Sequence, residues 1–341
     1  MPVIDSDAHV IENEHTWDYM SAAEQEYRPR VIMAPGPSGA DIQWWQIDGH
    51  RRGKQTNVGE DTPEASRELL DVTLRLKHMD ELGVDLQVLF PSVFLSPLTG
   101  RPEVELALCR SYNRWMADIW AHGKDRLRWA AVLPLMSMDA ALQELEWARG
   151  QGACAVFIRG LEGDRRLTDS YFYPLYERAG DLDVPICVHS ATGNFAQYDL
   201  YEGDSGFARF KLPNVAAFHA LVFHGIPARF PKLRFGFIEI SAQWVPYAIH
   251  DLGRRLERQG RPLPANVLGA NRIWVACQTD DDLPYVLKYA GEDNLVIGSD
   301  YGHADTATEI EALRRLKECA EISPRAIDRI LDDNARALYG L

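Results

Sequence analysis

Short apolar runs alternate with longer segments of helical periodicity along most of the chain. Eight of these runs are rich in Val, Ile, Leu, Phe and Ala and are flanked by Gly, Pro or charged residues, which is typical of buried strands. They lie near residues 3–10, 85–91, 128–134, 153–159, 185–189, 233–239, 272–277 and 295–300. Between them, apolar residues recur at spacings of three and four, as in 103–122 and 245–258, and predict amphipathic helices.

Strands that are apolar throughout and separated by helices are typical of a parallel sheet covered on both faces. Eight strand–helix units predict a closed α/β barrel of the (β/α)8 or TIM type, and an open doubly wound sheet is the alternative. The barrel is favoured because polar residues follow several of the runs, and barrel sites gather at the carboxyl ends of strands. We therefore expect one barrel domain over residues 1–341.

One long segment, residues 16–62, interrupts this alternation directly after the first run. Pro and Gly are scattered through it among Trp44, Trp45 and His50, so it is predicted to be irregular. Long excursions inside a compact domain are usually functional. We expect this insertion to cover the site.

The composition narrows the class of partner. The chain has 46% hydrophobic and 25% charged residues and a formal net charge of −14, which fits a globular protein and disfavours binding to nucleic acid or to an anionic membrane. The five cysteines form no C-x-x-C pair, and no leader or membrane-spanning run is seen. We expect a cytoplasmic homo-oligomer, of two or more chains, that acts on a small molecule.

Four residues at run ends suggest a metal site. Asp7 and His9 lie two positions apart, so in a strand they share a side. His189 and Asp300 end two further apolar runs. Each has an ordinary alternative, because a strand-end acid can cap a helix and a lone histidine is usually a core residue. Together, however, they predict a single divalent cation bound at the barrel mouth, since a buried carboxylate is costly unless it is paired or coordinated.

The motifs also resemble those of a known family. They are the residues 5–12 (DSDAHVIE), 79–85 (MDELGVD), 187–189 (CVH), 229–234 (RFPKLR) and 298–303 (GSDYGH). In this order they resemble the metal-dependent amidohydrolase superfamily, specifically the amidohydrolase 2 branch with aminocarboxymuconate-semialdehyde and resorcylate decarboxylases. The resemblance implies a (β/α)8 barrel with one divalent ion, usually zinc or manganese. By position it implies that Asp7, His9, His189 and Asp300 are ligands and that Asp300 also moves protons.

The chain departs from the decarboxylase pattern at two positions. Asp7 is an acid where those enzymes have a first histidine, which adds an oxygen donor and makes manganese less surprising. The sixth strand ends in Glu239, where the resemblance leads us to expect a catalytic histidine. Glu239 is therefore a candidate base or ligand, and its alternative is a structural glutamate paired with an arginine.

Further candidates lie near the same strand ends. His303 is a candidate for stabilising charge on the substrate, and Arg159 for clamping a carboxylate with two hydrogen bonds. Aromatic walls are predicted from Trp44, Trp45 and Trp244, and a hydrogen bond to a ligand's outer nitrogen from Glu12. The ordinary alternatives are a solvent-facing histidine, an exposed arginine, packed tryptophans and a loop glutamate.

Two reactions suit such a site. The first is non-oxidative decarboxylation, a carbon–carbon lyase reaction on a small carboxylated aromatic or cyclic substrate, with Asp300 or Glu239 protonating the carbon. The second is hydrolysis of an amide, ester or lactone by a metal-activated water. A metal-free barrel that only binds a ligand is a third interpretation. Decarboxylation is our first prediction.

Overall fold

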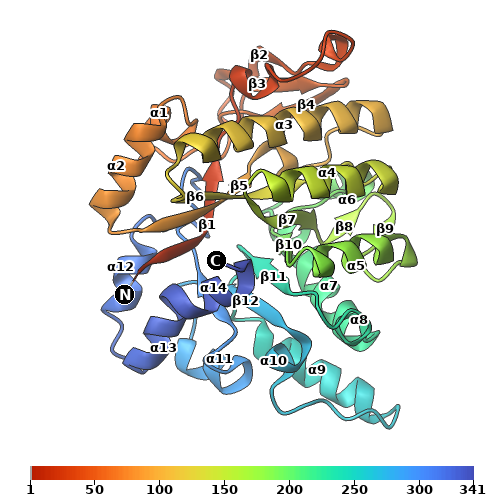
Figure 1. Ribbon diagram of the computed structural model, residues 1–341, viewed down its shortest axis with the longest axis vertical. Coiled ribbons are helices and arrows are strands. Elements are labelled where there is room, and N and C mark those ends of the chain that lie inside the picture. Colours follow the sequence, from red (N-terminus) through yellow and green to blue (C-terminus); the bar gives the residue numbers. More distant parts are fainter. Residues whose placement is uncertain (1) are drawn as a thin grey trace.

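The computed structural model describes residues 2–341 and contains eight parallel strands ringed by helices (Figure 1). Each strand pairs with the next in chain order, and all eight were predicted from their apolar runs. They are β1 (Ile4–Val10), β5 (Leu86–Pro91), β6 (Leu127–Val132), β7 (Ala153–Arg159), β10 (Ile186–His189), β11 (Phe235–Ile238), β12 (Ile273–Cys277) and β13 (Leu295–Ile297). The predicted (β/α)8 barrel is confirmed, and its strands are buried almost throughout.

The barrel closes between β13 and β1. The backbone N–H of Asp300 donates to the carbonyl of Asp7 at 2.8 Å, and that of His9 donates to the carbonyl of Tyr301 at 2.9 Å. A Cβ on Gly298 would lie 2.2 Å from the Cβ of Asp7, so only glycine permits this approach. Closure therefore places the residues after β13 directly beside Asp7 and His9.

The helices follow the predicted segments closely. The predicted helices appear as α1 (Glu64–Arg67), α2 (Val72–Leu82), α3 (Pro102–His122), α4 (Met138–Gly150), α5 (Tyr173–Asp181), α7 (Leu212–Phe223), α8 (Ile226–Arg229), α9 (Val245–Glu257) and α11 (Leu283–Ala290). The apolar pattern did not predict α6 (Phe195–Leu200) or α10 (Val267–Asn271). After the last barrel strand come α12 (Ala312–Lys317), α13 (Pro324–Asp328) and α14 (Asn334–Tyr339). Within residues 2–341, no helix has the length and apolar character required to span a bilayer.

The insertion is more regular than predicted. Residues expected to be irregular form an antiparallel sheet of β2 (Arg30–Pro35), β3 (Asp41–Ile47) and β4 (His50–Gly53), at the top edge of Figure 1. Asp48 and Gly49 both have positive φ between β3 and β4. Such a pair forms the tight turn that matches strand twist, and an Asp-Gly dipeptide is its usual sequence. The alternation that buries Trp45 and Ile47 was hidden by the surrounding Gly and Pro.

Candidate metal centre

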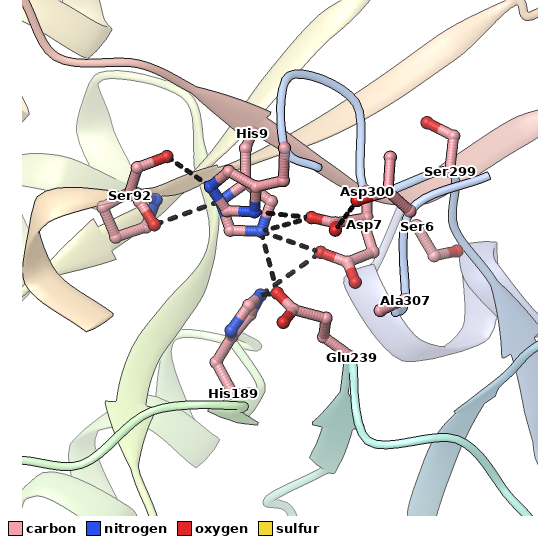
Figure 2. A network of polar contacts seen from close by, with 12 residues as sticks. Ser6, Asp7, His9, Ser92, His189, Glu239, Ser299, Asp300 and Ala307 are labelled. Atoms are coloured by element: carbon pink, nitrogen blue, oxygen red, sulfur yellow. Dashed lines mark hydrogen bonds and ion pairs between the residues drawn. The ribbon is translucent and has the colours of Figure 1, made fainter. Parts of the chain in front are cut away.

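Five polar side chains converge at the carboxyl ends of four barrel strands (Figure 2). They are Asp7 and His9 from β1, His189 from β10, Glu239 after β11 and Asp300 after β13. Nε2 of His9 lies 3.5, 3.2 and 3.4 Å from carboxylate oxygens of Asp7, Glu239 and Asp300. Nε2 of His189 lies 3.2 Å from Asp7 Oδ1 and 3.5 Å from Glu239 Oε2. The structure thus brings together all four predicted ligands and Glu239.

The ring nitrogen of His9 that faces the cluster, Nε2, carries no proton. Its Nδ1 lies 3.1 Å from the carbonyl oxygen of Pro91, which can only accept, so Nδ1 carries the hydrogen. Burial lowers the pKa of His9 to about 3, which keeps the ring neutral. Nε2 therefore points a lone pair at carboxylate oxygens, and among residues 2–341 neither Nε2 nor Oε2 of Glu239 has a hydrogen-bond partner. Opposed lone pairs of this kind suit a shared cation.

The cluster brings three buried carboxylates close together. Burial raises the pKa of Glu239 well above its ordinary value, and the neighbouring Asp300 adds to this rise. Burial also raises the pKa of Asp300 to about 6, although His303 opposes the shift. For Asp7, burial acts upward, but the imidazoles of His189 and His9 together outweigh it and hold the pKa below its usual range. A divalent ion would relieve the cost of burying these carboxylates together.

The backbone at two of the residues is strained. Glu239 has φ +61° and Asp300 has φ +52°, both in the left-handed region that non-glycine residues seldom adopt. Such conformations cost about 1–3 kcal/mol each and concentrate at functional sites. Here each turns a carboxylate inward at the point where the chain leaves its strand.

His303 forms a second polar unit beside the cluster. Its Nδ1 lies 2.7 Å from Oδ1 of Asp300, and its Nε2 lies 2.7 Å from Oγ of Ser92. The Ser92 hydroxyl donates to the Val10 carbonyl at 2.8 Å, so Nε2 must donate to Oγ. Burial opposes protonation of His303, but the charge of Asp300 raises its pKa above the ordinary value. Both ring nitrogens then carry hydrogens.

A buried network that includes Arg75 of α2 supports β1. The carboxylate of Asp5 accepts from Gln87 at 2.9 Å and from Oγ of Ser299 at 2.6 Å. Arg75 donates to Gln87 at 2.7 Å and to the carbonyl of His9 at 3.2 and 3.3 Å. Its guanidinium also lies 3.6 Å from the ring centroid of Tyr301. This network holds both closing strands at the positions from which the cluster projects.

The cluster opens into a cavity of about 530 Å³ at the barrel mouth, a size typical of small-molecule sites. Glu239, His303 and Ser92 line it together with Trp45, Arg209 and Lys211. Trp45 was predicted, whereas Ser92, Arg209 and Lys211 were missed. Polar residues in loops are too common for their sequence positions alone to single these out.

Three other predicted site residues do not line this cavity. Arg159 lies outside this cavity lining and pairs with Glu162 at 3.0 Å, on the wall of a second cavity, so its guanidinium is already occupied. Trp44 donates to the carbonyl of Ala34 and stacks under Arg51 within the insertion. Trp244 packs against the core, with its ring centroid 4.9 Å from that of Phe218.

Of the two roles considered for Glu12, the structure supports the loop glutamate and not the hydrogen bond to a ligand. Its carboxylate accepts from the backbone N–H groups of Ser92 and Val93 at 3.0 and 2.9 Å. The outer nitrogen of His9 is oriented by the Pro91 carbonyl instead. Glu12 therefore fixes the turn after β5, which carries Ser92 to the cavity wall.

A (β/α)8 barrel with carboxylates and imidazoles within 4.8 Å of one another at its strand ends belongs to the class of barrels that can hold a catalytic metal ion. Within that class, the sequence matches the profile of the Amidohydrolase family over residues 4–341, and the chain belongs to this family. The resemblance inferred from the motifs is thereby confirmed.

Individual relatives agree with this assignment. The chain is 31% identical over 156 residues to a gamma-resorcylate decarboxylase of Rhizobium radiobacter; the match covers 42% of this chain and 47% of that relative, about half its length. An amidohydrolase from Mycobacterium avium subsp. paratuberculosis superposes with a TM-score of 0.77 at 21% identity, over 99% of both chains. A 5-carboxyvanillate decarboxylase from Novosphingobium aromaticivorans, complexed with manganese and 4-hydroxy-3-methoxy-5-nitrobenzoic acid, superposes with a TM-score of 0.73 at 17% identity, over 100% of this chain and 96% of that one. Both structures share the fold.

Proposed function

We propose that this chain is a metal-dependent decarboxylase that releases carbon dioxide from a small carboxylated aromatic or cyclic acid. One divalent ion is held by Asp7, His9, His189 and Asp300, with Glu239 facing the same centre. The unpartnered lone pair of His9 among three carboxylate oxygens supports the ion. The decarboxylase relatives support the reaction.

The donor set favours a particular kind of metal. Three carboxylates and two imidazoles offer mixed oxygen and nitrogen donors with an excess of negative charge. Oxygen-rich sites suit manganese, whereas zinc prefers four ligands with more nitrogen or sulfur. We therefore expect manganese to be bound in preference to zinc. When bound, the ion would hold the substrate carboxylate and a neighbouring oxygen and withdraw electron density from them.

The observation that carries the reaction type is the hydrogen bonding of His303. Its two ring nitrogens face Asp300 and Ser92 as donors, and the residue lies on the cavity wall. Decarboxylation requires an acid that protonates the ring carbon bearing the carboxylate. The carbon–carbon bond to that carboxylate then breaks, its electron pair returns to the ring, and carbon dioxide leaves. His303 supplies the proton from Nε2, and Asp300 stabilises its charged form.

Hydrolysis is the second candidate function, and Glu239 is the residue that favours it. Its Oε2 has no hydrogen-bond partner among residues 2–341 and faces the cluster, where an attacking water would be deprotonated. A metal-free binding protein is the third candidate. Assembly as a homo-oligomer, a cytoplasmic location and a covering role for residues 16–62 stay predictions. The last is supported by Trp45, Arg52 and Lys54 in the cavity lining.

Elemental analysis of the purified chain, followed by a substrate screen in D2O, tests the proposal. We expect about one bound divalent ion per chain and release of carbon dioxide from a hydroxybenzoate, with deuterium at the carbon that carried the carboxylate. Metal-stripped enzyme should be inactive and should regain activity with Mn²⁺. Products of amide or lactone cleavage without carbon dioxide would replace decarboxylation with hydrolysis. A chain that binds no metal would contradict both.

A further inference from the structure

Arg209 presents an unused hydrogen-bonding edge on the cavity wall. Its Nε and Nη2 atoms are buried, and within residues 2–341 neither has a hydrogen-bond partner. These two atoms lie along one edge of the planar guanidinium, an edge through which arginine binds a carboxylate with two parallel hydrogen bonds. A buried donor without a partner costs free energy, more so when it is charged. The edge is thus complementary to an oxyanion.

The local structure holds this guanidinium in place. Arg209 lies in a π-helical turn (Phe207–Lys211) that leads into α7, and such turns are frequently found at functional sites. Its guanidinium stacks 4.2 Å from the ring centroid of Tyr198. Arg52 stacks on the same ring at 4.7 Å. Tyr198 therefore lies between two guanidinium groups and fixes the orientation of Arg209.

Arg52 and Arg209 differ in what their donors contact. Arg52 donates to the carbonyls of Pro97 and Arg51, which occupy its guanidinium. Within the described residues 2–341, Nε and Nη2 of Arg209 have no comparable acceptor. Lys211, two residues further on, also lines the cavity, and its Nζ lies 3.4 Å from Oγ1 of Thr306. Arg209 and Lys211 thus place two neighbouring cations on the cavity wall, both with hydrogen-bond donors available to a ligand.

The acids of the same cavity already have partners elsewhere. Glu12 accepts two backbone N–H groups, and Asp305 accepts from Nδ2 of Asn57 and from the N–H of Ala307 at 2.9 and 2.8 Å. Glu239 belongs to the metal cluster. The described acids that line the cavity are therefore committed to other contacts, and an external anion is the fitting partner for Arg209.

We infer that Arg209, assisted by Lys211, binds a second carboxylate of the substrate, remote from the group held at the metal cluster. This inference rests on the proposed function and narrows its substrate class to small aromatic or cyclic dicarboxylic acids. Only one of the two carboxylates is lost in the reaction. The other remains on the product and keeps it bound at Arg209 until release.

Calorimetric titration of the manganese-loaded enzyme tests this assignment. The probes are 2-hydroxybenzoate and its 3-, 4- and 5-carboxylated derivatives, which differ only in the presence and position of a second carboxylate. We expect at least one dicarboxylate to bind the natural chain 10-fold or more tightly than 2-hydroxybenzoate. Arg209→Gln should reduce this ratio to within about twofold, and Arg209→Lys should retain part of it, because lysine keeps the charge but not the paired donors.

The matched control is Arg254→Gln, which removes an exposed arginine on α9 and should leave the ratio unchanged. Metal content and thermal unfolding of each variant confirm that the cluster and fold are intact, and Lys211→Gln gives a second, partial loss. Equal binding of mono- and dicarboxylates by the natural chain, or a ratio that survives Arg209→Gln, would overturn the inference. A ratio that depends on Arg209 without carbon dioxide release would instead contradict the proposed reaction and leave the anion site standing.

Discussion

The imidazole rings of His9 and His303 lie nearly face to face, with centroids 3.9 Å apart and planes inclined by 32°. The two rings have opposite roles in hydrogen bonding. His9 turns a bare nitrogen toward the cluster, whereas His303 donates to Asp300 and Ser92. The proposed proton donor thus packs against the ring of a proposed metal ligand.

His303→Asn tests the acid role. Asparagine can still hydrogen bond to Asp300 but cannot carry and release a proton, so we expect kcat to fall by about 10²–10⁴-fold. Bound metal, measured by elemental analysis, should stay at the natural level. The control is His224→Asn, which changes an exposed histidine and should leave kcat unaltered. Natural turnover in His303→Asn would remove this residue from the mechanism.

His189→Ala and Asp300→Asn separate binding from turnover. His189→Ala removes a nitrogen donor for which no neighbour can substitute, and we expect metal affinity to fall by 100-fold or more. Asp300→Asn keeps an oxygen donor, so most metal should stay bound while turnover is lost, because the amide no longer stabilises protonated His303. Elemental analysis and carbon dioxide release measure the two effects. Undiminished metal in His189→Ala, or turnover in Asp300→Asn, would contradict the assigned roles.

Gly298→Ala tests the closure of the barrel. The added methyl group would overlap Asp7, 2.2 Å from its Cβ, so β13 and β1 must separate. We expect a loss of about 3 kcal/mol or more in the free energy of unfolding, together with weaker metal binding. Denaturant unfolding measures the first effect. Gly150→Ala, at the end of α4 with open space around it, is the matched control and should be neutral or slightly stabilising.

Glu105 should make stability depend on pH. It lies on α3 at the second cavity, where burial raises its pKa to about 7, with Arg159 opposing and Glu162 adding to the shift. The folded chain therefore holds a proton that the unfolded chain has lost, and stability should fall between about pH 4.5 and 7 by roughly 1–3 kcal/mol. Glu105→Gln should remove this part of the dependence and still accept the N–H of Met136. The measurement is denaturant unfolding at pH 5 and pH 8. An equal change in the free energy of unfolding for the natural chain and for Glu105→Gln would contradict the assignment.

The barrel could be predicted because its strands and helices follow from local patterns of apolar and polar residues. Each buried strand is a continuous apolar run, and α2 ends at Gly83, whose positive φ provides the left-handed cap that glycine typically supplies. The small sheet of the insertion was missed, although Asp48-Gly49 is a turn signal, because its strands are half exposed and the surrounding Gly and Pro suggest irregular structure.

The candidate metal ligands were predictable because each lies in or directly after an apolar run, toward its carboxyl end. Asp7, His9, His189, Glu239 and Asp300 have this position, and the structure brings them together. Arg209 lies in a helical turn between strands, and it stands out because two of its buried donors have no hydrogen-bond partner within residues 2–341. No local sequence pattern predicts this lack of partners, because it depends on which acceptors the fold brings near the guanidinium.

The meeting of β1 with the residues after β13 also fixes when the site can exist. Asp7 lies in the first strand of the barrel, whereas Asp300 follows the eighth. The donors therefore cannot converge on a nascent chain that is still short of its eighth strand. A polypeptide that ends before β13 would lack Asp300, one of the four proposed ligands, together with the residues that close the barrel.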